Sequence, residues 1–341
     1  MILTGINQIE ITDKVVPEIT QPDQVLIKMK SVGICGSDIH YYTEGKIGSQ
    51  VVEYPFTVGH EGAGIIEKAG SSVTSLQPGD RVAIDPAMPC FNCDQCKAGR
   101  YHTCRKLKFL GCPGQAEGCL SEYLVMPASS CLKISDSMTL DQAALSEPLA
   151  IGVYAAGMAF PIQGKKVGIL GSGPIGISVL LPVLAAGAEK VYMTDLIDAR
   201  LAIAAEMGAS WTGNPDQIDI VKEIVKNEPL HLDVVFECCG KQEAVDQAVL
   251  LLKPGGHLMI IGIPSFPRWS FDVDTLRRKE IEIKNVRRQN ESAEQTLQMI
   301  ANGTLKPDRM QTHNFTFDQV KEAFEMVAHY KDGVMKAMVH F

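Results

Sequence analysis

Hydrophobic and polar residues partly alternate over 25–32, where several side chains are β-branched, and this pattern predicts a β-strand. Two further short strands are predicted over 62–69 and 81–84. Each segment is bounded by Gly, Pro, Asn or Asp, as in the turn formed by residues 77–80. Few helices are predicted before Pro148, so we expect the first part of the chain to be rich in β-structure.

The pattern changes after Pro148, where short apolar segments alternate with segments of helical periodicity. Strands that alternate with helices predict βαβ units and a parallel sheet, and right-handed crossovers then give a doubly wound fold. The expected class is therefore α/β, with a β-rich domain before a doubly wound one. The predicted strands span 165–170, 191–194, 233–236 and 257–263, and the predicted helices span 174–186, 199–207 and 244–252.

The tail predicts a helix over 317–327 and a closing strand over 336–341. We expect it to pack back on the first domain. The predicted domains are 1–148, completed by the tail 291–341, and 149–290. A chain of 341 residues also exceeds what one hydrophobic core usually spans, which favours two domains.

The longest uncharged run, 167–188, is long enough for a membrane span to be considered. Its glycines, together with Pro174 and Pro182, argue against a membrane helix. A strand, a glycine turn and a helix explain the run better. Pro182 then falls in the middle of that helix and should kink it.

Composition narrows the classes of partner. A net charge of −8 argues against nucleic-acid binding, which needs clustered cations. The N-terminus lacks the basic and apolar blocks of a secretory signal, so a reducing, cytoplasmic location is expected. In such a compartment the ten cysteines are better interpreted as metal ligands or buried thiols than as disulfides.

A glycine motif follows the predicted strand 165–170 and opens the predicted helix after it. Gly171, Gly173 and Gly176 have the GxGxxG spacing that allows a tight turn and a close approach to a pyrophosphate. Asp195 ends the next strand, where a carboxylate accepts hydrogen bonds from the ribose hydroxyls and repels a 2′-phosphate. The pattern therefore favours NAD over NADP, although Arg200 could contact the adenine or ribose, or could be a solvated helix residue.

Four cysteines lie in one short polar stretch that begins after Pro89. Four thiolates suit a closed, tetrahedral zinc site, which stabilises a loop and has no open position for chemistry. The sequence therefore predicts a structural zinc at Cys90, Cys93, Cys96 and Cys104.

A second metal site is suggested more weakly. Cys35, His60 and Glu61 are all residue types that bind zinc, and three protein ligands plus water make a catalytic site. From spacing alone, a single cysteine and a His-Glu pair are more often structural. The residues by themselves leave both interpretations open.

The chain resembles the zinc-containing medium-chain dehydrogenase/reductases. The segment 35–38, the Gly-His-Glu-Gly-Ala-Gly motif at 59–64, the four-cysteine lobe and the GxGxxG motif occur in that family's order. The resemblance covers essentially the whole chain, and implies a GroES-like catalytic domain, a Rossmann domain and an active-site cleft between them. Residues 35–48, 146–150 and 194–200 look like those of the sorbitol (L-iditol 2-) dehydrogenase branch.

The resemblance implies roles for individual residues. Cys35, His60 and Glu61 match catalytic zinc ligands, and Glu147 matches an acid beside the metal that binds water or substrate and in some relatives ligates directly. Ser37 and His40 match a proton relay, Tyr41 a substrate-contacting tyrosine, and Arg288 a polyol-binding arginine. The expected cofactor contacts are Gly171, Gly173, Pro174, Ile175, Gly176, Asp195, Arg200, Gly262 and Ile263.

This branch implies oxidation of a secondary alcohol on a polyol to a ketose, with two zinc ions per chain and NAD as hydride acceptor. A dimer or tetramer is expected by resemblance. Gln289 in place of an aromatic residue, the unusual segment 111–118 and the complete four-cysteine set depart from the branch. L-Threonine, 2,3-butanediol or a sugar-alcohol phosphate therefore stay open as substrates, and a non-catalytic zinc-ribbon and nucleotide-sensing protein is the alternative of another class.

Overall fold

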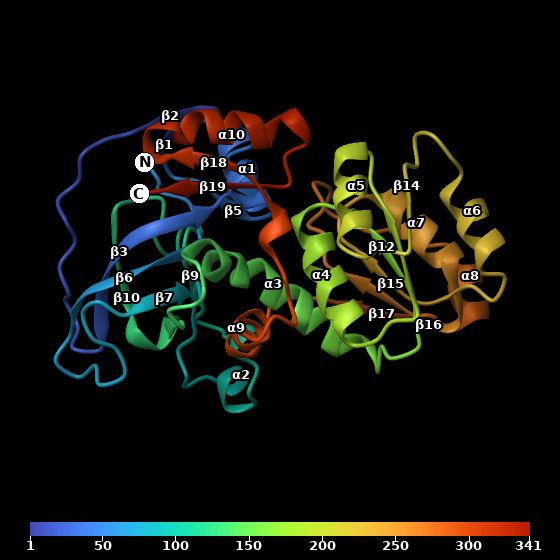
Figure 1. Cartoon of the computed structure of the whole chain (residues 1–341), viewed down its shortest axis with the longest axis horizontal. Helices are drawn as coiled ribbons and strands as arrows, with labels where there is room; N and C mark the ends of the chain where they lie inside the picture. The colour runs from blue at the N-terminus through green and yellow to red at the C-terminus, as the bar shows by residue number, and fades with distance from the viewer. The chain divides into compact units, whose positions relative to one another are not determined.

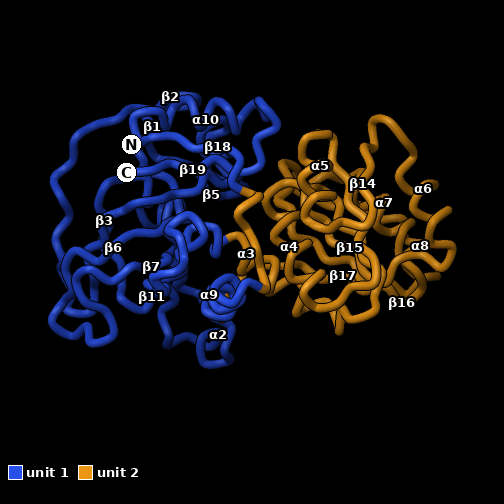
Figure 2. Tube along the Cα trace, in the orientation of Figure 1, with its two compact units in different colours: residues 1–147, 293–303, 311–341 blue, residues 148–292, 304–310 orange.

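The computed structural model describes residues 1–341 and divides them into two compact units (Figure 2). Unit 1 contains residues 1–147, 293–303 and 311–341, and unit 2 contains 148–292 and 304–310. The sequence analysis assigned the whole tail, 291–341, to the first domain, whereas the compact units group 304–310 with unit 2.

Unit 1 is built on a seven-stranded sheet. Its order is β11-β7-β6-β3-β19-β18, with β10 pairing β3 in addition. The long strand β3 therefore contacts β6, β10 and the tail strand β19 (Figure 1). The strands are β3 (Gln24–Gly33), β6 (Glu61–Ala69), β7 (Arg81–Ile84), β10 (Tyr123–Pro127), β11 (Cys131–Lys133), β18 (Gln311–Thr316) and β19 (Lys336–His340).

Three two-stranded ribbons and four helices complete this unit. The apolar faces of the sheet and of α10 enclose one core, which includes Ile27, Val32, Val82 and Phe324. The ribbons are β1 (Ile2–Gly5) with β2 (Gln8–Glu10), β4 (Lys46–Ile47) with β5 (Gln50–Val51), and β8 (Ala87–Met88) with β9 (Lys108–Phe109). The helices are α1 (Gly36–Thr43), α2 (Asp94–Lys97), α9 (Ala293–Ala301) and α10 (Val320–Ala328).

Unit 2 contains a parallel sheet in the order β14-β13-β12-β15-β16-β17 (Figure 1). Renumbered from its first strand, this is the 3-2-1-4-5-6 order of a Rossmann sheet. The strands are β12 (Lys166–Leu170), β13 (Lys190–Thr194), β14 (Trp211–Gly213), β15 (Leu232–Glu237), β16 (Leu252–Ile260) and β17 (Glu282–Asn285). The helices between them are α4 (Pro174–Ala185), α5 (Asp198–Glu206), α6 (Ile220–Asn227), α7 (Gln242–Leu251) and α8 (Val273–Lys279).

The doubly wound prediction is confirmed, and most predicted elements are within a few residues of the observed ones. Every residue of β15 is buried, as expected for a central strand with helices on both faces. The uncharged run 167–188 forms β12, the glycine turn and α4, with Pro182 inside the helix. None of the helices has both the length and the apolar character that a membrane span requires.

The sequence analysis missed six helices, namely α1, α2, α3, α6, α8 and α9. The short helix α1 follows Cys35, and α3 (Leu140–Ala159) continues through Pro148, where the pattern had indicated a change. Most residues of α3 are buried, so the helix has no polar stripe from which its periodicity could be recognised. Its many alanines favour the helix despite the proline.

The first prediction concerns the packing of α4 against the glycine turn. A Cβ added at Gly176 would lie 1.9 Å from the carbonyl oxygen of Gly171, so Gly176→Ala forces the turn and helix apart. We expect a loss of stability of about 1–3 kcal/mol, the usual cost of overpacking, in urea unfolding. Gly157→Ala in α3 is the control, because nothing lies within 4 Å of its added Cβ. An unchanged unfolding midpoint for Gly176→Ala would contradict the tight turn.

Candidate active site

Cys35, His60 and Glu61 are brought together by the pairing of β3 with β6. Gly33 at the end of β3 pairs with Glu61 at the start of β6, and Cys35 follows two residues later as the N-cap of α1. One ligand atom from each of the three residues lies within 4.8 Å of the others. His60 and Glu61 are buried and Cys35 is half-buried, so the set suits a metal ion that is reached from one side.

Asp38 lies beside His60 and was not singled out by the sequence analysis. It is fully buried, and its two oxygens accept the backbone N–H groups of Gly59 and Cys35, each at 3.0 Å. Its Oδ1 also lies 3.4 Å from His60 Nδ1. Burial lowers the pKa of His60, but the charges of Asp38 and Cys35 outweigh it and raise the pKa overall. A carboxylate on one ring nitrogen is the usual partner of a histidine that binds metal through the other.

Glu61 is held by Lys336, the first residue of the tail strand β19. The ammonium group donates to both carboxylate oxygens, at 2.8 and 2.6 Å, and both side chains are about 1% exposed. Burial lowers the pKa of Lys336, but the neighbouring Glu61 and Cys35 raise it overall, so the lysine is charged. The sequence offered one signal for this residue, a lysine within an otherwise apolar closing strand.

The residues predicted to handle the proton lie on or near α1. Ser37 Oγ is 3.4 Å from His60 Nε2, which places this hydroxyl beside the ligand set. His40 lies further along the helix, and its Nδ1 is 2.8 Å from Glu44 Oε1 on a partly exposed face. The contacts fit the two ends of a relay, and the relay itself stays a prediction.

Tyr41 is buried beside two polar groups from other segments. Its hydroxyl lies 3.4 Å from Gln50 Oε1 and 3.8 Å from Cys112 Sγ, and Gln50 Nε2 lies 2.8 Å from the same sulfur. Burial, followed by the contact with Cys112, raises the pKa of Tyr41 above its usual range. The predicted contact of Tyr41 with the substrate stays a prediction.

Glu147 and Arg288 are the two remaining predicted residues. Glu147 lies on α3 directly before Pro148 and is not part of the three-residue ligand set, although its charge contributes to the raised pKa of Lys336. Its predicted role as an acid beside the metal stays a prediction. Arg288 follows β17 in unit 2 with a φ of +58°, and its Nε and Nη1 are buried. Its predicted contact with a polyol stays a prediction.

The four-cysteine lobe has the dimensions of a tetrahedral zinc site. The Sγ atom of Cys93 lies 3.6 Å from that of Cys96 and 3.9 Å from that of Cys104. The Sγ atoms of Cys90 and Cys104 are 3.5 Å apart. Zinc–sulfur bonds of about 2.3 Å give sulfur–sulfur distances of about 3.8 Å in a tetrahedron. Backbone N–H groups of Cys96 and Arg105 lower the pKa of Cys93 to about 6, which favours the thiolate that zinc requires.

The cofactor loop lies at the carboxyl end of β12, where the strand order of the sheet reverses. Gly171 has a φ of +102°, which glycine tolerates best, and Pro174 begins α4 after Gly173. Asp195 accepts the backbone N–H groups of Ser172 and Ile197 at 2.8 and 2.9 Å, so the acid is fixed against the loop.

Arg200 is also directed at this loop. It is 8% exposed, and its Nη1 lies 3.4 Å from the point that a Cβ on Gly173 would occupy. The low exposure argues against a solvated helix residue, and contact with the adenine or ribose stays a prediction. Gly262 and Ile263 follow β16 at the same edge of the sheet, and a Cβ on Gly262 would lie 2.5 Å from Glu237 Oε2.

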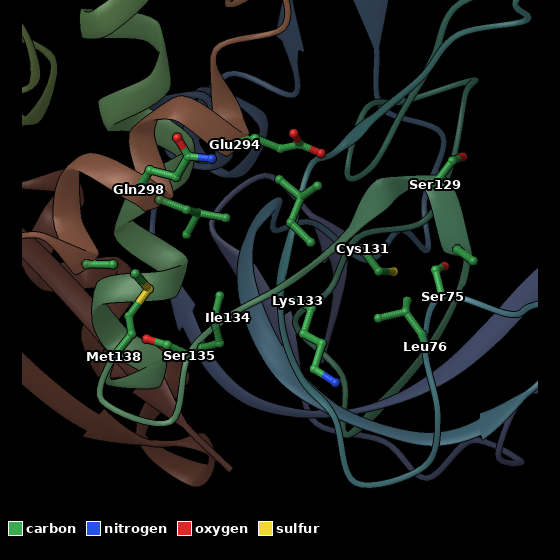
Figure 3. A pocket seen from close by; sticks show the side chains of 14 residues that line it. Ser75, Leu76, Ser129, Cys131, Lys133, Ile134, Ser135, Met138, Glu294 and Gln298 are labelled. Atoms are coloured by element: carbon green, nitrogen blue, oxygen red, sulfur yellow. The ribbon is translucent and has the colours of Figure 1, made fainter.

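A separate cavity of about 550 Å³ lies within unit 1 (Figure 3). Side chains of β11 and α9 line it, among them Cys131, Lys133, Glu294 and Gln298. It includes none of the predicted metal, substrate or cofactor residues. This cavity is therefore not the site described above.

Comparison with known proteins covers both units. Residues 21–136 match the alcohol dehydrogenase GroES-like domain, and residues 174–302 match the zinc-binding dehydrogenase domain. A sorbitol dehydrogenase of Bacillus subtilis is 36% identical, with 99% of this chain and 96% of that protein covered. A probable D-xylulose reductase A of Aspergillus fumigatus is 34% identical, with 96% and 92% covered.

A solved structure is similar over the same length. A putative zinc-binding dehydrogenase of Sinorhizobium meliloti, bound to NADP, has a TM-score of 0.92 and 29% identity. The alignment covers 100% of this chain and 98% of that one. Both units of this chain are thus found together, in the same order, in that structure.

The second prediction tests the role of Asp38. Asp38→Asn removes the charge that faces His60 Nδ1, and we expect metal affinity at the Cys35 site to fall by about 10–100-fold. Competition with a chelator measures this affinity. Glu67→Gln is the control, because Glu67 is exposed on the same strand as Glu61. Equal affinities for the two variants would show that Asp38 does not support the site.

Proposed function

The chain belongs to the zinc-containing medium-chain dehydrogenases, in their sorbitol dehydrogenase-like branch, and from this membership we propose that it oxidises a secondary alcohol of a polyol to a ketone with NAD. The observation that carries the proposal is the buried ligand set of Cys35, His60 and Glu61, whose ligand atoms lie within 4.8 Å of one another. Three protein ligands leave a coordination position for the substrate, which a structural site does not. Polyols such as sorbitol, xylitol or L-iditol are the proposed substrates.

Two groups supply the chemistry that side chains lack. Zinc bound at Cys35, His60 and Glu61 would act as a Lewis acid that lowers the pKa of the substrate hydroxyl, and bound NAD would accept the hydride. A second zinc at Cys90, Cys93, Cys96 and Cys104 would only stabilise its loop.

The residues around the ligand set bind the substrate and move its proton. Ser37, whose Oγ lies 3.4 Å from His60 Nε2, takes up the proton that the substrate hydroxyl loses and releases its own hydroxyl proton in the same step. His40 passes it to solvent from its partly exposed position beside Glu44. Tyr41, Glu147 and Arg288 bind the remaining hydroxyl groups of the polyol.

The loop after β12 binds the cofactor, and Asp195 favours NAD. The N-terminal N–H groups of α4 face the pyrophosphate, while the Asp195 carboxylate beside Ser172 accepts ribose hydroxyls. The similar Sinorhizobium meliloti structure is bound to NADP, so both cofactors belong in the assay. A cytoplasmic location and a homo-oligomer both stay predictions of the sequence analysis.

The same oxidation could act on substrates other than polyols. Gln50 and Cys112 both lie beside the Tyr41 hydroxyl. Cys112 belongs to the segment 111–118, which departs from the sorbitol dehydrogenase branch. L-Threonine, 2,3-butanediol and a sugar-alcohol phosphate are therefore the competing substrates. A non-catalytic nucleotide sensor has no need of the buried Cys35 set.

The third prediction is the activity itself. Zinc-loaded protein is incubated with NAD or NADP and with sorbitol, xylitol, L-iditol, galactitol, L-threonine or 2,3-butanediol, and reduced cofactor is followed by absorbance. We expect NAD-dependent oxidation of a polyol that is lost on chelation. Turnover of threonine or butanediol alone would move the protein to another branch. NAD binding without turnover of any alcohol would favour the non-catalytic alternative.

The fourth prediction separates chemistry from cofactor binding. Cys35→Ala removes one ligand of the catalytic set in unit 1, whereas the NAD residues lie in unit 2. We expect turnover to fall by at least about a thousandfold, as when a catalytic charge is lost, with NAD affinity unchanged in a fluorescence titration. Cys131→Ala is the control, since this buried thiol belongs to neither metal set. Near-normal turnover of Cys35→Ala would contradict the scheme.

A further inference from the structure

Glu237 is a buried carboxylate to which neither the sequence analysis nor the proposed function assigns a role. It is the last residue of β15, at the carboxyl edge of the parallel sheet of unit 2, and it is fully buried. In the sheet order β15 lies beside β12, which is where the order of the strands reverses. Ligands of doubly wound sheets bind outside this edge. A buried carboxylate there is costly unless its hydrogen bonds are used.

One oxygen of Glu237 holds the turn that follows β15. Its Oε1 accepts the backbone N–H groups of Cys239 and Gly240, at 2.8 and 2.6 Å. Gly240 then turns the chain with a φ of +69°, which glycine tolerates best. Two backbone donors are thus satisfied by one carboxylate oxygen, and these charge-assisted bonds fix the shape of the turn.

This turn is packed against the glycine loop that follows β12. The backbone N–H group of Cys238 donates to the carbonyl oxygen of Leu170 at 2.8 Å. A Cβ added to Gly171 would lie 3.1 Å from Cys239 Cβ and 3.3 Å from the Cys239 nitrogen. The nitrogen that Glu237 holds is therefore directly behind the loop that is proposed to bind the pyrophosphate.

The segment that follows β16 also depends on Glu237. The backbone carbonyl oxygen of Glu237 accepts the N–H groups of Ile261 and Gly262, at 2.9 and 3.0 Å. A Cβ on Gly262 would lie 2.5 Å from Glu237 Oε2. A Cβ on Gly240 would lie 2.5 Å from the carbonyl oxygen of Ile263. Gly262 and Ile263 are predicted cofactor contacts, so the same carboxylate and its turn set the position of this second segment.

A second buried glutamate of the same sheet shows a different kind of contact. Glu228 lies at the opposite, amino edge and is held by the side chains of Lys166, Lys190 and Tyr192. In Glu237 the Oε2 atom has no hydrogen-bond partner, and Oε1 contacts only backbone groups of the turn. Glu228 thus joins strands through side chains, whereas Glu237 joins loops at the edge where the cofactor is proposed to bind.

We propose that Glu237 is a positioning residue of the cofactor site, which holds the loops after β12, β15 and β16 in the arrangement that binds NAD. The inference rests on the proposed function and deepens it, because it assigns part of the cofactor affinity to a residue that acts through these loops. Glu237 acts by means of its acceptor oxygen. A side chain of similar size without an acceptor leaves the N–H groups of Cys239 and Gly240 unpaired and loosens the turn behind Gly171.

The experiment measures NAD binding apart from turnover. Glu237→Leu removes the acceptor, whereas Glu237→Gln keeps one oxygen that can accept both N–H groups. Affinity is measured by fluorescence titration, and stability by urea unfolding without NAD. We expect the dissociation constant of NAD to rise about 10–100-fold in Glu237→Leu, because two hydrogen bonds are lost, and to stay within about threefold of wild type in Glu237→Gln.

Cys239 provides a second readout that needs no variant. This residue is exposed at the turn, so its alkylation by iodoacetamide, located by peptide mass spectrometry, reports on access to the site. NAD at about ten times its dissociation constant should slow alkylation of Cys239 in the wild type by about tenfold, because only the free fraction reacts. In Glu237→Leu without NAD, alkylation should be faster than in the wild type.

The matched control is Glu228→Leu, which removes a buried carboxylate from the other edge of the same sheet. It should lower stability and leave the NAD affinity of the folded protein unchanged. If folded Glu237→Leu, or Glu237→Ala where the Leu variant does not fold, binds NAD as tightly as the wild type, the proposal is wrong. It is equally wrong if Glu237→Gln loses as much affinity as Glu237→Leu, or if NAD does not slow the alkylation of Cys239. Wild-type protein that binds neither NAD nor NADP would instead contradict the proposed function itself.

Discussion

The antiparallel pairing of β3 with β6 is the constraint on which the catalytic centre depends. It sets Gly33 opposite Glu61 and so brings Cys35, beyond the end of one strand, to His60 and Glu61 at the start of the other. A shift of this register by one residue would turn the Glu61 side chain to the other face of the sheet, away from Cys35. The ligands are therefore fixed by strand pairing across the sheet, not by a local loop. The four-cysteine lobe differs, since its ligands lie within one short segment and need only a turn.

The two units differ in how much of them could be predicted from the sequence. In unit 2, alternating strands and helices, the glycine motif and Asp195 are all local signals, and they predicted the doubly wound class and a glycine turn between β12 and α4. The four cysteines also gave a clear prediction, because their close spacing in one segment is typical of a tetrahedral zinc site. In unit 1 the strands were partly recognised, but α1 was too short and α3 too uniformly buried to show a helical stripe.

The residues that support the catalytic ligands could not be predicted from spacing. Asp38 resembles an ordinary N-terminal helix residue until its contacts with Gly59, Cys35 and His60 are seen. Lys336 and Glu61 are 275 residues apart in the chain, and no local pattern links them. Ligands are recognised by residue type, whereas their partners are defined by tertiary contacts. The outer contacts of a metal centre are thus the part that requires a structure.

The position of β19 has a consequence for how the protein is made. This strand, from the last few residues of the chain, is inserted between β3 and β18, and it carries the lysine that neutralises Glu61. During synthesis, residues 31–33 of β3 lack a strand partner on one edge, and Glu61 lacks its cation, until β19 has been made. The nucleotide-binding unit has nearly all of its residues before that moment. The catalytic centre is therefore completed only after the nucleotide-binding unit has been synthesised.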